Sequence, residues 1–266
     1  LFLNPASDLT SDFVLDISPA FIALLAFTGF LAGGINTVAG GGSNLTLPAL
    51  MMLGLPADVA NGTNRIAVLL QCVVGVRGYD SHKTLDRPAI VPILIPNIAG
   101  GIIGALGAAL MPNLYLKPIL LTTILAMSVI ILVRPSLIAP PPGTPTLSPK
   151  ESPIAWWSLF AAGVYGGFVQ AGVGFILLAA LSGGLRYDLV RANALKMTCA
   201  LAFTAVAFVI FAAFGQVSWI PGLIVASGTM LGAHLAVKVA VKASQNSIKW
   251  FLFLMTLCAV AGGFFL

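Results

Sequence analysis

Charged residues are scarce in this sequence. They make up 8% of its 266 residues, whereas 59% are hydrophobic. A soluble protein of this length needs far more charge to cover its surface. Apolar runs long enough to cross a hydrocarbon layer of about 30 Å recur along the chain. The composition therefore excludes a soluble domain. It predicts an all-α, multi-pass protein of the cell (inner) membrane, surrounded by the lipid bilayer.

Acidic residues are absent from the apolar runs. The eight carboxylates fall near the start of the chain, at turns or in one long linker: Asp8, Asp12, Asp16, Asp58, Asp80, Asp86, Glu151 and Asp188. The chain thus lacks the membrane-centre carboxylate that usually relays protons in a driven pump. His234 is the only histidine in an apolar run, which makes it a candidate for proton coupling. The alternative is a histidine that is simply packed within the bundle.

Cysteines and catalytic motifs are also few. Cys72, Cys199 and Cys258 lie far apart in apolar runs, without the Cys-x-x-Cys spacing of a metal or redox site, so we interpret them as packing residues. The sequence has no Walker motif and no zinc-ligand spacing. We therefore expect no catalytic residue, cofactor or metal. The net charge of +5 comes from scattered residues at the ends of apolar runs, which predicts no nucleic-acid partner.

The apolar segments predict the spans. They are residues 19–36, 43–53, 65–79, 89–110, 116–133, 153–170, 174–183, 193–214, 219–237 and 248–266. Segments 43–53 and 174–183 are too short to cross the bilayer and are predicted to be half-helices. The first run lacks a basic n-region, so it predicts a span and not a cleavable signal.

Prolines divide the chain nearly in two. Residues 134–152 contain several prolines, which forbid a helix and predict a semi-rigid linker. The predicted organisation is an extracytoplasmic tail (1–18), a first transmembrane repeat (19–133), a cytoplasmic linker (134–152) and a second transmembrane repeat (153–266).

Two glycine-rich breaks interrupt the apolar runs at matching places in the two halves. Each half continues with similar residues in the same order, which predicts an internal repeat. The matches are Gly29-x-x-x-Gly33 with Gly163-x-x-x-Gly167, Asn36 with Gln170, Gly40-x-Gly42 with Gly172-x-Gly174, Gly54-Leu55-x-x-Asp58 with Gly184-Leu185-x-x-Asp188, and Ala60-Asn61 with Ala192-Asn193.

Positive charge predicts the orientation. Residues 1–64 contain no Lys or Arg, so this end is expected outside. If each broken segment makes two short traverses, every basic cluster falls on the cytoplasmic side. Each half then makes an odd number of traverses, so the second half is predicted to be inverted relative to the first. Arg65 and Lys117 are the exceptions, on the outer side.

These residues resemble a known family. Two amide-bearing glycine breaks, each followed by a short helix, a Gly-Leu-x-x-Asp turn and an Ala-Asn helix start, are similar to the TauE/SafE sulfite-exporter family. The more specific part is Gly33–Pro48, followed by Asn61-Gly62-Thr63-Asn64. The resemblance covers about residues 19–266. It implies export of sulfite or a small organosulfur anion, with proton coupling often proposed.

The breaks predict an anion-binding site. A helix N-terminus presents unpaired N–H groups and the positive end of the helix dipole, and glycine lets a ligand approach the backbone. Neutral side chains and two cations, Arg65 and Lys196, adjoin the breaks and the following helix starts. The predicted substrate-binding residues are Asn36, Gly40, Gly41, Gly42, Ser43, Asn44, Asn61, Thr63, Asn64, Arg65, Gln170, Gly172, Gly174, Asn193 and Lys196. The competing interpretation is that the polar residues only cap helices.

We therefore expect a secondary transporter that exports a small sulfur-containing anion by alternating access. The alternatives are a passive small-anion channel and an uptake carrier for a related oxyanion. A membrane enzyme or an assembly factor would need a catalytic group that the sequence lacks. The small-residue face Gly100-x-x-x-Gly104 has two interpretations, close packing within the chain or a contact in a homodimer.

Overall fold

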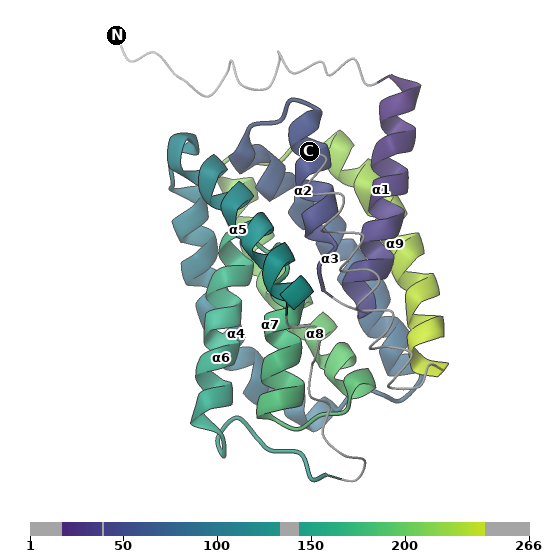
Figure 1. The fold of residues 1–266 in the computed structure, drawn as a ribbon, viewed down its shortest axis with the longest axis vertical. Helices are drawn as coiled ribbons and strands as arrows, with labels where there is room; N and C mark the ends of the chain where they lie inside the picture. The colour runs from purple at the N-terminus through teal and green to yellow at the C-terminus, as the bar shows by residue number, and fades with distance from the viewer. Residues whose placement is uncertain (1–17, 39, 134–143, 243–266) are drawn as a thin grey trace.

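The computed structural model describes residues 18–38, 40–133 and 144–242, and these contain helices and no strand (Figure 1). The helices are α1 (Pro19–Val38), α2 (Ser43–Met52), α3 (Ala57–Ser81), α4 (Arg87–Ala109), α5 (Asn113–Val133), α6 (Pro153–Phe168), α7 (Val173–Leu178), the π-helix η1 (Ala179–Gly184), α8 (Leu189–Ala213) and α9 (Trp219–Lys242). In the described part of the chain, α1, α3, α4, α8 and α9 are long and apolar enough to cross a membrane. The predicted all-helical membrane architecture is confirmed. The predicted segment 248–266 and Cys258 lie outside the described residues.

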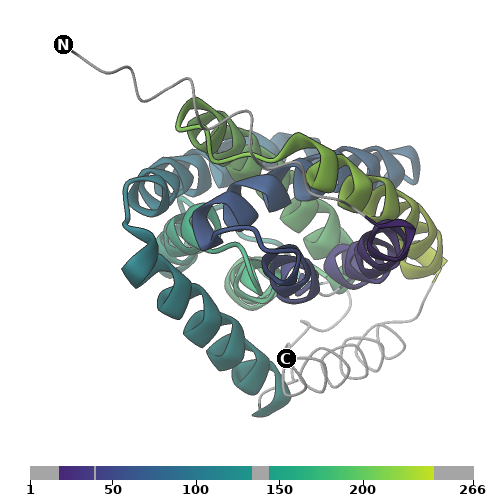
Figure 2. The same cartoon turned by 90° about the horizontal axis from the view of Figure 1, so that it is seen from above.

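The outer surface of the bundle is apolar. Large hydrophobic side chains are exposed on α1, α4, α8 and α9, among them Phe27, Val91, Val209 and Leu231, whereas α3 is mostly buried. Contiguous exposed apolar surface of this kind is stable against lipid and not against water. Seen from above, α5 lies at the margin of the bundle (Figure 2).

Both predicted helix breaks are present. α1 ends at Val38 before α2 begins at Ser43, and α6 ends at Phe168 before α7 begins at Val173. α7 continues directly into η1, so the second short helical segment runs over 173–184, close to the predicted 174–183. Gly40 and Gly172 have φ angles of +100° and +74°, a left-handed conformation that glycine adopts at little cost.

Two helices begin earlier than predicted. The predicted spans begin at residues 65 and 193 and the predicted Ala-Asn helix starts lie at Ala60 and Ala192, whereas α3 begins at Ala57 and α8 at Leu189. Asp188 caps α8, because its Oδ1 accepts hydrogen bonds from the Val190 and Arg191 amides at 3.0 Å. Four polar residues one to two turns further on are buried and hydrogen-bonded within the protein, although hydropathy treats them as water-facing: Asn61, Arg65, Asn193 and Lys196.

The connections gather at two ends of the molecule. At one end, which we call the Asp58 end, Gln216 Nε2 donates to Ala109 O at 3.0 Å, and Asn113 Nδ2 donates to Asp58 Oδ1 at 2.8 Å. At the other, which we call the Asp86 end, Asp86 Oδ2 accepts from Tyr187 Oη at 3.0 Å and from Arg191 Nη2 at 2.9 Å. α3 therefore runs from the Asp58 end to the Asp86 end, and its sequence counterpart α8 runs in the opposite direction.

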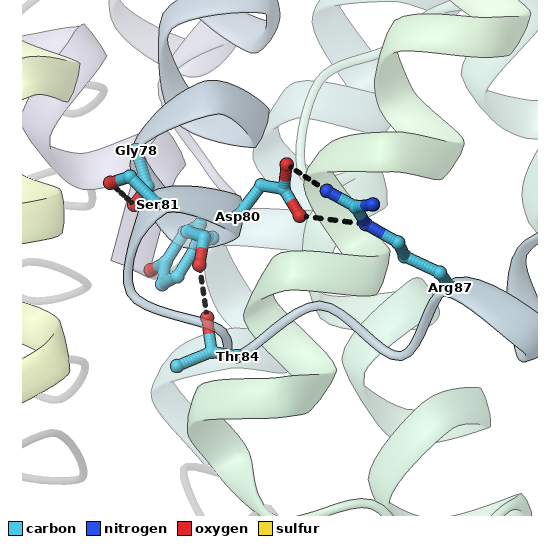
Figure 3. Close-up of polar contacts among 6 residues, drawn as sticks. Gly78, Asp80, Ser81, Thr84 and Arg87 are labelled. Atoms are coloured by element: carbon cyan, nitrogen blue, oxygen red, sulfur yellow. Dashed lines mark hydrogen bonds and ion pairs between the residues drawn. The ribbon is translucent and has the colours of Figure 1, made fainter.

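The turn between α3 and α4 belongs to the Asp86 end (Figure 3). Arg87 forms an ion pair with Asp80 at 2.9 Å, and Thr84 Oγ1 donates to the Tyr79 carbonyl at 2.8 Å. Across this end, burial and the hydrogen bond to Asp86 raise the pKa of the Tyr187 phenol to about 12. The phenol therefore stays protonated and remains a donor at any physiological pH.

Basic residues concentrate at the Asp86 end. Lys83 and Arg87 flank the α3–α4 turn, and Arg186 and Arg191 flank the η1–α8 connection. The linker also reaches this end, because the Leu147 amide donates to the Leu185 carbonyl at 3.0 Å. These basic clusters lie at the same end of the molecule, as predicted if each broken segment makes two short traverses. That this end faces the cytoplasm stays a prediction.

Two helix pairs pack with their backbones in contact. α1 and α9 lie side by side in both views (Figures 1 and 2), and α4 packs on α6 in the same way. A Cβ added to Gly228 would lie 2.1 Å from Ala26 O, and one added to Gly104 would lie 1.9 Å from Val164 O. The Gly100-x-x-x-Gly104 face is thus filled by α6. This face packs within the chain and is not available for a homodimer contact.

Candidate substrate site at the two broken helices

The two breaks meet inside the bundle. The Gly174 amide donates to the Gly40 carbonyl at 3.3 Å. A Cβ added to either glycine would lie 2.2 Å from the Cα of the other. Gly41 faces the ring of Phe175, because a Cβ added to Gly41 would lie 3.2 Å from the nearest ring carbon. Residues 134 positions apart are therefore in direct backbone contact.

The start of α2 is held against α1 and α3. A Cβ on Gly42 would lie 2.3 Å from Ala32 O and 2.7 Å from Asn36 Cβ, so Asn36 and the α2 N-terminus are neighbours. Asn36, Ser43 and Asn44 are all buried. Many backbone amides here are already used in turns: the Asn44 amide donates to Gly41 O at 3.1 Å, and the Leu45 amide to Gly42 O at 3.0 Å.

Ser43 anchors α2 to α3. Asn64 Nδ2 donates to Ser43 Oγ at 3.1 Å, and Thr46 Oγ1 donates to Asn64 Oδ1 at 2.6 Å. The N-cap of α2 is Gly42, without a side-chain capping bond, so the alternative in which Ser43 caps the helix is wrong. Thr46 was not predicted from the sequence. Its position three residues after Ser43 puts both on one helix face, which is the signal that would have found it.

Gln170 forms the polar part of the second break. Its backbone is left-handed, with φ at +67°, and its Nε2 donates to Thr204 Oγ1 at 2.9 Å. Its Oε1 is buried and has no hydrogen-bond partner among the described residues. Thr204 was also missed, although it lies three helical turns after Asn193 and so shares its face of α8.

Arg65 caps the broken end of α6. It is fully buried, and its guanidinium donates to the carbonyls of Gly166 at 2.6 Å, Gly167 at 2.9 Å and Phe168 at 3.4 Å, and to Asn61 Oδ1 at 3.1 Å. The last carbonyls of a helix lack partners within it and form the negative end of its dipole. We call this arrangement the Arg65 clasp.

Lys196 does the same for α1. Its Nζ donates to the carbonyls of Asn36 at 2.9 Å and Thr37 at 3.0 Å, and to Asn193 Oδ1 at 2.7 Å. We call this arrangement the Lys196 clasp. Each half thus supplies the cation that holds the broken helix of the other half. Both cations adjoin the breaks as expected, but in this structure they donate to backbone carbonyls.

Two predicted residues are not brought to the breaks. Thr63 Oγ1 accepts from the Ser218 amide at 2.9 Å, which ties α3 to the α8–α9 connection. His234 is exposed on α9. It lies two residues after Gly232, which packs on α1, and two residues turn about 200° around a helix. The structure therefore places His234 on the outward face, away from the breaks.

The charge balance around the breaks favours an anion. The buried polar and charged residues of the described chain include Arg65 and Lys196 but no Asp or Glu. Buried cations without a carboxylate leave a positive potential that anions can neutralise. The arrangement can therefore bind an anion through amide and hydroxyl donors without any covalent chemistry.

Broken helices that meet within a membrane bundle, around buried cations, define a class of protein: a polytopic membrane transporter. The chain belongs to the sulfite exporter TauE/SafE family, whose model matches residues 25–262.

Curated relatives are similar over most of their length. A probable membrane transporter protein of Haemophilus influenzae is 27% identical over 249 residues, which cover 93% of this chain and 96% of the relative. The probable membrane transporter protein ORF9 of a Sinorhizobium species is 26% identical over 244 residues, covering 91% and 92%. The probable membrane transporter protein YfcA of Escherichia coli strain K12 is 26% identical over 235 residues, covering 88% and 86%. These relatives are named as transporters and not as enzymes.

Proposed function

We propose that this protein exports sulfite or a small organosulfur anion across the inner membrane, with the anion held where the two breaks meet. The contact between Gly40 and Gly174 carries this proposal, because it brings the ends of two broken helices to one buried place. Asn36 and Ser43 lie beside the first break and Gln170 lies in the second; all three are buried and carry neutral polar groups. Neutral donors hold an oxyanion without trapping it, as release requires.

The arrangement of the helices supports transport by alternating access. α3 and α8 run in opposite directions between the two ends, and the α1–α9 contact corresponds to the α6–α4 contact. We propose that the halves form an inverted repeat whose members exchange shapes, so that the site opens first to one side and then to the other. The Asp86 end, which carries the basic clusters, then faces the cytoplasm.

Uptake of labelled sulfite into proteoliposomes tests this function. We expect saturable uptake by the wild type, and a loss of at least about tenfold in N36L, S43L and Q170L, because each change removes a polar group from the buried site. S227L is the matched control, since Ser227 is exposed on α9 and bonds only its own helix at Ile224. Size-exclusion profiles verify that the variants are folded. Wild-type rates in all three site variants would overturn the assignment.

The same vesicles separate the alternatives. A passive channel lets sulfite equilibrate but cannot concentrate it, whereas a coupled carrier concentrates it when a pH gradient is imposed. Vesicles sorted by orientation distinguish an exporter from an uptake carrier. Competition by sulfate, thiosulfate, sulfoacetate and carboxylates then identifies the preferred anion.

A further inference from the structure

The two clasps occupy matching places but differ in chemistry. In each, a cation follows an asparagine on the same helix face and holds the last carbonyls of a helix from the other half. Arg65 keeps its charge at every physiological pH, whereas a buried lysine is a group that exchanges its proton. Only the Lys196 clasp can therefore change its charge during a transport cycle.

The Lys196 clasp requires a protonated amine. An ammonium group has three N–H donors, and Nζ has three acceptors within 3.0 Å, the carbonyls of Asn36 and Thr37 and the Oδ1 of Asn193. A neutral amine has two donors and a lone pair. After loss of the proton, one acceptor would lose its hydrogen bond and face that lone pair. Deprotonation therefore favours release of the end of α1.

No carboxylate holds the proton in place. From α3, Lys196 is faced by Cys72 and by Tyr79, whose hydroxyl donates to the same Thr37 carbonyl at 3.4 Å. From α1 it is faced by backbone carbonyls, and from its own helix by Asn193. The buried residues of the described chain include no Asp or Glu. A nearby substrate anion would thus be the negative charge that favours the ammonium form.

We infer that Lys196 carries the proton coupled to anion transport, in place of the exposed His234. This inference rests on the proposed function. The proton leaves Nζ for water when the end of α1 is released, and one returns from water when the clasp forms again. Anion binding and protonation of Lys196 favour each other, so the two move through the cycle together.

Proteoliposomes with K196R, K196Q and H234Q test the inference. A gradient of one pH unit concentrates an anion about tenfold when one proton is coupled to it. We expect accumulation near this factor for the wild type and H234Q, after subtraction of protein-free vesicles. K196R keeps a charge and K196Q keeps hydrogen-bond donors, but neither exchanges a proton in this range. Both are expected to lose accumulation. Exchange of labelled for unlabelled sulfite is expected to persist at a reduced rate in K196R, which keeps the positive charge, and to weaken further in K196Q, which does not.

Calorimetry of sulfite binding in buffers of different ionisation enthalpy gives a second measurement, and needs only the wild type. After correction for the ionisation of sulfite itself, we expect about one proton taken up per anion bound near the midpoint of the pH dependence. Binding without proton exchange, or gradient-driven accumulation by either lysine variant, would overturn the role of Lys196. Absence of any sulfite exchange by the wild type would instead overturn the proposed function.

Discussion

At the scale of single residues, the glycines of the breaks are required for two different reasons. Gly40 and Gly172 have left-handed backbones, where a side chain causes strain. Gly174 is not among the positive-φ residues, yet a Cβ on it would lie 2.2 Å from the Gly40 Cα. The contact between the two halves therefore requires glycine even where the backbone conformation does not.

Replacing Gly174 with alanine tests this contact. Gly174→Ala forces two backbones apart, and overpacking of this kind typically destabilises by about 1–3 kcal/mol. Gly183→Ala is the control, because nothing lies within 4 Å of a Cβ there. Thermal unfolding in detergent should show a lower midpoint for Gly174→Ala and little change for Gly183→Ala. Equal midpoints would contradict the close approach of the breaks.

The sequence predicts which polar residues adjoin the breaks, but it does not predict which residues of the other half they contact. Asn36 and Ser43 lie in or beside a break in the sequence itself. The clasps join residues about 100 to 160 positions apart, such as Arg65 with Gly166 and Lys196 with Asn36. Such contacts depend on how two helices pack, which no local pattern determines.

At the scale of helices, the breaks were predictable and two of the helix starts were not. Glycines and amides inside apolar runs are visible in the sequence, and α2 begins at the expected residue. The predicted spans begin later than α3 and α8 because hydropathy treats the polar residues just before them, such as Asn61, Asn64 and Arg191, as water-facing. In the structure their polar groups bond within the protein, so the helices include them.

Helix packing gives a prediction on α4. Gly104→Ala would place a Cβ 1.9 Å from the Val164 carbonyl oxygen, whereas Gly107→Ala, on the same helix, would place one 3.6 Å from the ring of Phe168. The first substitution must separate α4 from α6, and the second makes an ordinary contact. Expression of folded protein and its unfolding temperature should fall for Gly104→Ala only. A matching loss for both variants would contradict this account of the packing, because the change from glycine to alanine raises helix propensity equally at both positions.

At the scale of the whole molecule, the basic residues and the opposed helices describe one topology. The sequence predicts this topology when each broken segment is counted as two short traverses of the membrane. Only then do the basic clusters fall on the same side. The shared Asp86 end places Lys83, Arg87, Arg186 and Arg191 together, as that count requires. The packing of one half on the other lies beyond such counting, because it depends on the shapes of the helix surfaces.

Labelling of single cysteines tests the sidedness. His82 and Pro112 are exposed at the Asp86 end and the Asp58 end respectively. In a variant without native cysteines, a membrane-impermeant maleimide should label P112C on intact cells and H82C only after permeabilisation, because the basic end is expected in the cytoplasm. The opposite labelling pattern would reverse the proposed orientation.

The exchange of cations between the halves has a consequence for biosynthesis. The end of α1 lies near the beginning of the chain, but the lysine that satisfies its carbonyls is 160 residues further on. The ribosome must therefore finish α8 before the first broken helix can be completed, and until then Arg65 also lacks the α6 carbonyls that it holds. Each half alone leaves buried polar groups without hydrogen-bond partners. The first half therefore completes its structure only after the second half has been synthesised and inserted into the membrane.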